Sequence, residues 1–555
     1  MNAFVQKHHR TLFYATWFLV GMLQASFSEL LDDEAYYWVF SRFLDWGYFD
    51  HPPMTALLIR MGTALFPGEL GVRLLMVVLN TLTIFLCEKL TDKKDPATFY
   101  LVCFSLAVLQ IGGFLAVPDN PLMFFTALFF LAYRRFVTTP SVAHTFLMAV
   151  VTTFLLYSKY HAALIILFTL LSNLSLLRRW QTYVAGLLAL LFYLPHLWWQ
   201  YGHDWISFRY HLFESNVNPY KVSYTLDYIL GQILIAGPLA GVIFWNAVVR
   251  YRTLSLTERA LKATGIGIFL FFFLSSFRGR VEANWTAPAI IPIIVLSHQY
   301  LLQHAKARRW TVRLLAPTLV LVVLLRTVIV FDLVPVKAVA ERFHSWKGWP
   351  QELFQKTHGL PVVLSSSYQN SSKYWFYSGQ PTYSLNEYMR RRNNYNFWPI
   401  EDSLFGRPVV VFNAPTPEGP QDSLATPIGT IHYSFDSSFH SFSKVMVRPQ
   451  EKDYATTGNG EVVLNAATTL PDAYRKYLLE HPQVDFPVKA GLFDKKGWLK
   501  DVELPLTLQQ LVRQQTVSVR IRPELPEGTY FIRFAIGSDA GWFSHNSDKI
   551  KLLIQ

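Results

Sequence analysis

Residues 11–38 read TLFYATWFLVGMLQASFSELLDDEAYYW, an apolar run followed by three consecutive carboxylates, Asp32, Asp33 and Glu34. An apolar run of this length is enough to cross the hydrocarbon core of a bilayer. Ionisable side chains at membrane depth cost free energy and usually mark a functional site. The stretch therefore predicts a membrane-spanning helix that leads directly into a site at the membrane surface.

The composition divides the chain into two parts. It has 555 residues, 52% of them hydrophobic, with a formal net charge of +12. Apolar segments fill roughly the first 335 residues, and the rest resembles a soluble protein. We expect a polytopic α-helical membrane protein with about 11 transmembrane helices and a soluble C-terminal part. The predicted spans are 11–30, 71–88, 98–117, 121–136, 141–157, 160–177, 181–200, 227–249, 260–277, 286–304 and 311–332.

The lysines and arginines beside these spans predict the topology. About twice as many lie on the side of the N-terminus as on the other side, which places the N-terminus in the cytoplasm. An odd number of spans then places the C-terminal part outside. Because the positive charge is concentrated in short loops beside spans, we expect membrane lipids and no nucleic acid as partners. The two cysteines, Cys87 and Cys103, lie in predicted spans and indicate no disulfide framework.

The loops on the outer side carry the candidate catalytic carboxylates. Asp33 and Asp119 could meet at one cavity, where a carboxylate accepts the proton of an attacking hydroxyl or amine. Glu34 is a candidate supporting residue, whereas Asp32 could be a solvated neighbour. The alternative for Asp33 is a polar helix end. The alternative for Asp119 is a helix cap, since Pro-Asp-Asn-Pro is a turn sequence.

Three outer cations, Lys159, Arg278 and Arg280, suit the binding of a phosphate diester. Arginine offers a planar fork of donors to phosphate oxygens, and lysine a compact charge. A departing polyprenyl phosphate needs this neutralisation, because negative charge develops on it in the transition state. The alternative is that these side chains reach the lipid headgroups.

A possible divalent metal site is a further hypothesis. Asp50, His51 and His203 provide oxygen and nitrogen ligands, but they lie on separate loops, and hydrogen-bonded structural histidines are the alternative. Residues 35–49 are rich in aromatic side chains and too polar to span, so they predict an interfacial helix on the outer leaflet.

Two motifs in the first outer loop resemble a known family. The segments DEAYYW (33–38) and GYFDHPP (47–53) resemble bacterial glycosyltransferases of the protein O-mannosyltransferase-like superfamily, families 39 and 83, which have the GT-C membrane fold. The similarity is greatest to the branch containing the lipid A aminoarabinose transferase. PDNP (118–121), SKYH (158–161) and VEANW (281–285) also resemble that branch. The resemblance covers residues 10–335 and continues more weakly to about residue 410.

The resemblance implies a polyprenyl-phosphate-linked sugar as donor and inverting transfer on the periplasmic face of the bacterial inner membrane. It implies Asp33 as the catalytic carboxylate and Asp119 as the second acidic position. His51 occupies the place of a lysine at the donor phosphate. A histidine is neutral for much of the time at pH 7, so Lys159 or Arg280 must supply a larger share of the positive charge at the donor phosphate. Lipid A, protein and another envelope glycan remain open as acceptors, and so does the sugar.

The C-terminal part is predicted to contain two periplasmic domains. Residues 336–435 predict a small α/β domain, with strands at 361–366 and 408–412 around a helix at 368–377. Residues 436–555 predict an immunoglobulin-like β-sandwich that could bind carbohydrate or a partner, or serve as a structural cap. Its predicted strands are 461–465, 517–521, 529–534 and 549–553.

Two other function classes fit a polytopic chain of this kind. A transporter or flippase of lipid-linked glycans would need polar residues in broken helices near the bilayer midplane. The predicted spans are largely apolar at their centres, and the unusual residues gather at one face, which favours an enzyme. A non-catalytic receptor that works through its outer domains is the third alternative.

Overall fold

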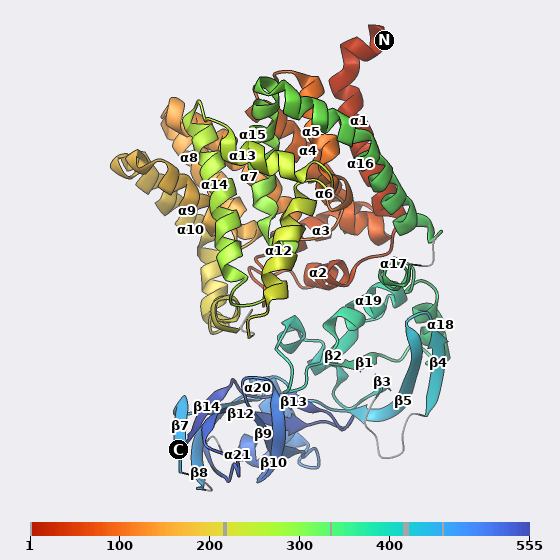
Figure 1. Cartoon of the computed structure of the whole chain (residues 1–555). Coiled ribbons are helices and arrows are strands. Elements are labelled where there is room, and N and C mark those ends of the chain that lie inside the picture. The colour runs from red at the N-terminus through yellow and green to blue at the C-terminus, as the bar shows by residue number, and fades with distance from the viewer. Residues whose placement is uncertain (1–2, 215–218, 334–335, 414–420, 458–459, 515) are drawn as a thin grey trace. The chain divides into compact units, whose positions relative to one another are not determined.

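The computed structural model describes residues 3–214, 219–333, 336–413, 421–457, 460–514 and 516–555. The chain forms two compact units, Met1–His344 and Ser345–Gln555. Figure 1 colours the first from red to green and the second from teal to blue. The first unit is helical, and the second combines helices with three β-sheets.

The helical unit contains most of the predicted spans as separate helices (Figure 1). They are α1 (Ala3–Phe27), α2 (Asp32–Arg42), α3 (Met54–Leu65), α4 (Gly68–Leu90), α5 (Pro96–Ser105), α6 (Ala107–Ile111), α7 (Asp119–Thr138), α8 (Val142–Ser158), α9 (Ala162–Ser172), η1 (Leu174–Arg178), α10 (Trp180–Gly202), α11 (Ile206–Arg209), η2 (Tyr210–Glu214), α12 (Val222–Ile235), α13 (Gly241–Arg250), α14 (Leu256–Ser275), η3 (Ala283–Ala289), α15 (Ile290–Gln303), α16 (Ala305–Phe331) and α17 (Lys337–Phe343). Five helical segments are long and apolar enough to cross a membrane: α4, α7, α10, η3 with α15, and α16. The prediction of a polytopic helical membrane protein is thus confirmed.

Some elements differ from the sequence prediction. The predicted span 98–117 is divided into α5 and α6, and the span 227–249 into α12 and α13. A broken helix needs new partners for its freed carbonyls in lipid. The Gln110 side chain donates to the Phe104 carbonyl at 2.8 Å, and the Arg326 guanidinium donates to the Gln110 carbonyl. These two contacts explain how α5 can end inside the unit.

The first outer segment is also folded differently. The prediction of one interfacial helix over 35–49 is wrong, because α2 ends at Arg42 and a loop follows. The next helix, α3, packs against α2 and α4 and was missed as an element of its own. Seven residues of α2 are buried, so this helix packs into the protein instead of lying on its surface.

The centre of the helical unit is α15. Every residue from Ile290 to Leu301 is buried, which fits a helix that is apolar on all sides. It packs against α5, α13 and α14 and joins one large hydrophobic core with α7 and α8. This core fixes the ends of the helices that carry the site described below.

The second unit begins with an α/β part. Its five-stranded sheet has the order β2-β1-β3-β5-β4, with β1 parallel to β2 and β3. The elements are α18 (Trp349–Lys356), β1 (Val362–Ser365), α19 (Tyr368–Ser378), β2 (Thr382–Leu385), η4 (Asn394–Asn396), η5 (Glu401–Leu404), β3 (Arg407–Phe412), β4 (Asp422–Thr426) and β5 (Gly429–Phe439). The predicted strand–helix alternation is confirmed, and α19 provides the crossover that parallel strands require.

Two further sheets share one hydrophobic core, as in a β-sandwich. Their orders are β10-β9-β12-β14-β7, with β13 on β12, and β11-β8-β6. The elements are β6 (Met446–Pro449), β7 (Asp453–Thr456), β8 (Val462–Thr469), α20 (Asp472–Glu480), β9 (Pro487–Phe493), β10 (Trp498–Thr507), α21 (Leu508–Arg513), β11 (Thr516–Ile521), β12 (Gly528–Gly537), β13 (Phe543–His545) and β14 (Ile550–Ile554). The four predicted strands are present. The proposed boundary at residue 435 falls inside β5, and the one at residue 335 lies nine residues before the division at His344.

Candidate functional site

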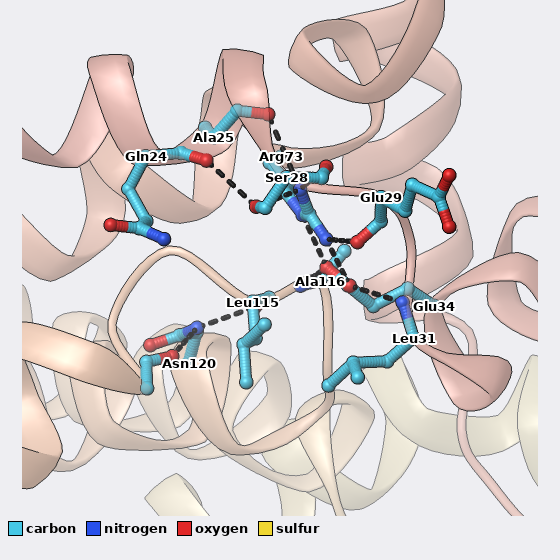
Figure 2. Close-up of polar contacts among 11 residues, drawn as sticks. Gln24, Ala25, Ser28, Glu29, Leu31, Glu34, Arg73, Leu115, Ala116 and Asn120 are labelled. Atoms are coloured by element: carbon cyan, nitrogen blue, oxygen red, sulfur yellow. Dashed lines mark hydrogen bonds and ion pairs between the residues drawn. The ribbon is translucent and has the colours of Figure 1, made fainter. Parts of the chain in front are cut away.

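A buried ion pair joins α2 to α4. The Arg73 Nε donates to Glu34 Oε1 at 2.7 Å, and its Nη2 lies 2.5 Å from Glu34 Oε2. Both side chains have no exposed surface. Figure 2 shows the two groups facing each other with several backbone groups around them. Glu34 is therefore enclosed by protein, which favours a positioning role over the direct catalytic role predicted for it.

Arg73 also donates hydrogen bonds to the residues that directly follow α1. Its Nη1 donates to the Ser28 carbonyl at 2.7 Å and to the Ser28 hydroxyl at 2.9 Å, and its Nη2 donates to the Glu29 carbonyl at 2.8 Å. The last turn of a helix leaves carbonyls without intrahelical partners. Arg73 supplies donors to the chain at this point, so it fixes where α1 ends and α2 begins (Figure 2).

The Glu34 carboxylate in turn accepts hydrogen bonds from two backbone amides. Its Oε2 accepts from the Leu31 N–H at 2.9 Å, and its Oε1 accepts from the Ala116 N–H at 2.8 Å. Ala116 belongs to the loop that leads into α7, and the Asn120 side chain donates to the Leu115 carbonyl in that loop at 2.6 Å. One carboxylate thus connects the segment carrying Asp33 to the segment carrying Asp119.

Asp119 is the centre of a second buried contact. Its Oδ1 accepts from the Lys159 ammonium at 2.7 Å, and its Oδ2 accepts from the Asn284 amide at 2.9 Å. The Asp119 and Lys159 side chains are only 8% and 7% exposed. Three segments that are widely separated in sequence therefore meet at one carboxylate. Asp119 therefore accepts hydrogen bonds from other segments and does not serve as a helix cap. Lys159 forms an ion pair with Asp119 instead of extending to the lipid headgroups.

Asp33 lies beside the buried pair but has a different environment. It is the second residue of α2, and its side chain is exposed, whereas the next side chain, Glu34, is fully buried. Neighbouring helix positions point in different directions, so burial of one does not imply burial of the next. Of the predicted catalytic carboxylates, Asp33 is the one open to a substrate.

The loop after α2 is anchored to α10 and α11. The Trp46 carbonyl lies 2.7 Å from His196 Nδ1, and the Tyr48 carbonyl accepts from the Ser207 hydroxyl at 2.7 Å. Burial raises the pKa of Tyr48, so its hydroxyl stays protonated and donates to the Phe40 carbonyl at 3.1 Å. These contacts fix the loop that carries Asp50 and His51.

His51 lies among other aromatic side chains of the outer segments. Its ring centroid is 5.4 Å from that of Tyr37 and 6.4 Å from that of His211. His211 Nε2 lies 2.8 Å from the Asp50 carbonyl oxygen, and its ring is 5.3 Å from Tyr160. His211 is not among the predicted site residues, although a histidine in a mostly apolar part of the chain could have indicated it.

The predicted arginines lie at the surface. Arg278 is exposed, and Arg280 is 66% exposed and pairs with Glu282 at 3.1 Å. An exposed pair of this kind contributes little to stability. Both guanidinium groups can therefore change partners when an anion binds.

The residues do not fit the predicted metal site. Within the described ranges, no group of three histidine, cysteine, aspartate or glutamate side chains is arranged to hold a metal ion. The His203 ring instead stacks on Trp199 with centroids 4.0 Å apart, and its Nδ1 lies 2.8 Å from the Trp199 carbonyl. Asp50, His51 and His203 thus do not assemble as the metal hypothesis requires.

Comparisons with known proteins show which families and structures this chain resembles. The family described as dolichyl-phosphate-mannose-protein mannosyltransferase matches residues 50–199. The lipid A galacturonosyltransferase RgtD of Rhizobium johnstonii is 25% identical over 305 residues, which cover 51% of this chain. The matched region spans 63% of the length of that relative.

A solved structure has the same fold. ArnT from Cupriavidus metallidurans, crystallised with undecaprenyl phosphate, matches with a TM-score of 0.53 and 13% identity. The match covers 76% of this chain and 97% of that structure. The chain thus has the GT-C membrane fold and is similar in sequence to one lipid A galacturonosyltransferase, which agrees with the resemblance found in the sequence.

The buried ion pair gives a stability prediction. Glu34→Gln leaves the Arg73 charge buried without a counter-charge, which costs about 3–5 kcal/mol. We expect a large fall in the apparent Tm of the purified protein in detergent, whereas Asp33→Asn, at the neighbouring exposed side chain, should change it little. A Glu34→Gln variant as stable as the wild type would contradict the role assigned to the pair.

Gly47 gives a packing prediction. A Cβ added there would lie 2.5 Å from the Trp199 ring, which is itself held by a 2.8 Å hydrogen bond to Asp45. Gly47→Ala should therefore destabilise the protein by about 1–3 kcal/mol through overpacking. Gly202→Ala is the matched control, since a Cβ at Gly202 meets nothing within 4 Å. Equal Tm values for the two variants would show that the loop is not fixed against α10.

Proposed function

We propose that this protein is a membrane glycosyltransferase that transfers a sugar from a polyprenyl-phosphate donor to an acceptor in the cell envelope. The observation that carries the proposal is the meeting of Asp119, Lys159 and Asn284, beside a segment that presents Asp33 to the exterior. The relatives support it: one is named for galacturonosyl transfer to lipid A, and the fold is that of a protein crystallised with undecaprenyl phosphate.

The first step requires a base. In our proposal the Asp33 carboxylate accepts the proton of the acceptor hydroxyl as its oxygen attacks the anomeric carbon of the donor. The bond from that carbon to the phosphate oxygen breaks on the opposite side. Direct displacement of this kind inverts the configuration at the anomeric carbon.

The second requirement is stabilisation of the departing phosphate. Arg278 and Arg280 are exposed cations that can donate to its oxygens, and His51 lies in the anchored loop on the same side in our proposal. Lys159 is the third cation in our proposal, and its pairing with Asp119 holds it without adding net charge to the buried region. We assign Asp119 to holding Lys159 and Asn284 in place.

The same relatives support a proposal for the location and the acceptor. We propose that the N-terminus is cytoplasmic, that the site faces the periplasm of a bacterial inner membrane, and that both domains of the second unit lie there. Lipid A is the first acceptor to test, because it is the acceptor named for RgtD. Protein and other envelope glycans are the next candidates.

The direct test uses the purified full chain in lipid nanodiscs. Undecaprenyl-phosphate-linked galacturonic acid and aminoarabinose are offered with lipid A, and products are read by mass spectrometry. Comparison of lipid A and envelope proteins from a deletion strain then searches for the natural product. Movement of the donor across reconstituted vesicles without any transferred sugar would favour a flippase.

The proposed base gives a kinetic prediction. Asp33→Asn should lower the rate of sugar transfer about 100-fold or more, since a positioned base contributes about that much. The apparent Tm should stay near that of the wild type, because the side chain is exposed. Asp32→Asn is the matched control and should retain activity. Transfer by Asp33→Asn at the wild-type rate would remove Asp33 from the mechanism.

His51 gives a prediction about donor binding. His51→Lys puts a permanent charge where the family that the sequence resembles has lysine, so the KM for the donor should fall. His51→Ala removes the side chain from the donor phosphate and should raise this KM several-fold. A donor KM that is the same in all three proteins would place His51 outside the phosphate site.

A further inference from the structure

An apolar cavity of about 120 Å³ lies among α7, α8, α9 and α10, away from the carboxylates described above. These helices pack against one another at one side of the helical unit (Figure 1). The lining is mostly aromatic and aliphatic and includes Phe129, Tyr133, Phe136, Met148, Ile166 and Leu176. Such a lining suits a hydrocarbon chain and not a sugar or a phosphate.

The cavity lies deep in the membrane region. The residues of α7 that line it, from Phe129 to Phe136, follow Asp119 along the same helix. At about 1.5 Å per residue, they lie roughly 15 to 25 Å from Asp119 along the helix axis. The hydrocarbon core is about 30 Å thick, so the cavity lies beyond its midplane, in the half opposite the proposed catalytic end.

The cavity opens toward lipid at Gly186. This residue lines the cavity and is exposed, and a Cβ added there would meet nothing within 4 Å. Its neighbours on α10, Leu187 and Leu190, are 57% and 50% exposed, as expected for side chains that face lipid. A chain running through the lipid beside α10 can therefore enter the cavity without displacing a side chain at this point.

We propose that this cavity binds the distal isoprene units of the polyprenyl donor. An acyl chain anchored in the outer leaflet ends near the midplane, whereas an undecaprenyl chain is long enough to pass it. Because α7 carries Asp119 at one end and the cavity near the other, a donor whose phosphate lies at the outer end can occupy both regions at once. This inference rests on the proposed function and adds a means of selecting donors by chain length.

The effect on affinity should be moderate. The distal units leave lipid and not water, so they gain packing contacts without a hydrophobic driving force. We expect undecaprenyl phosphate to bind the wild type about three- to tenfold more tightly than it binds a protein with the cavity filled. Farnesyl phosphate, which is too short to reach the cavity, should bind both proteins equally.

The experiment measures binding of these two phosphates to the full chain by native mass spectrometry. Gly186→Phe fills the mouth of the cavity, and Leu191→Phe, an exposed position on the other side of the same helix, is the matched control. The expected result is a three- to tenfold loss of undecaprenyl phosphate affinity in Gly186→Phe alone, with farnesyl phosphate affinity unchanged. Gly186→Leu replaces Gly186→Phe if the larger ring prevents folding.

A second measurement locates the chain end directly. Undecaprenyl phosphate with a photoreactive group at its distal end should label peptides of α7, α8, α9 or α10 in the wild type. An unchanged undecaprenyl preference in Gly186→Phe, or labelling confined to other helices, would overturn the cavity assignment while leaving the glycosyltransferase proposal intact. Loss of a co-purified phospholipid from Gly186→Phe, without a change in undecaprenyl phosphate affinity, would assign the cavity to phospholipid. Failure of both phosphates to bind the wild type would overturn the proposed function as well.

Discussion

The Glu34–Arg73 ion pair is the interaction on which the arrangement of the site depends. Two fully buried charges are costly to desolvate, and a pair of apolar residues often stabilises a protein as well or better. What apolar residues cannot do is bind backbone groups from several segments. Arg73 binds the end of α1, and Glu34 binds the start of α2 and the loop before α7. The main role of the pair is therefore to fix the positions of α1, α2 and the loop before α7 relative to one another, and not to add stability.

This fixed geometry separates the roles of three acidic residues that look similar in sequence. Glu34 is saturated by Arg73 and two backbone amides, and Asp119 is bound by Lys159 and Asn284. Both carboxylates have their charge balanced inside the protein. Asp33 shares the helix of Glu34 but is exposed, so the buried pair fixes the helix that carries an accessible side chain. A base needs this combination of a rigid support and an accessible carboxylate.

The sequence predicted which loops would carry the site but not how their side chains pair. Charge asymmetry placed the segments of Asp33, Asp119, Lys159 and Asn284 on one side, and the hydrogen bonds among them agree. The partner of Glu34 could not be predicted, because it lies 39 residues away and hydrophobic patterns do not encode side-chain pairing. Arg73 is a lone arginine near the start of an apolar span, and this was the feature of the sequence that could have indicated a buried partner. Likewise α3 was missed, since its 12 residues are too few for a span.

The breaks in α5–α6 and α12–α13 bear on the choice between an enzyme and a transporter. Broken helices in transporters place backbone groups and charges around a substrate near the midplane. Here the break after Ser105 is closed by side chains of the protein, because Gln110 and Arg326 contact the local carbonyls. Asn80 also donates to the Leu109 carbonyl at 3.1 Å. The break therefore shapes the loop that leads to Ala116 and Asp119, and the side chains around it support the candidate site instead of leaving backbone groups open to a substrate.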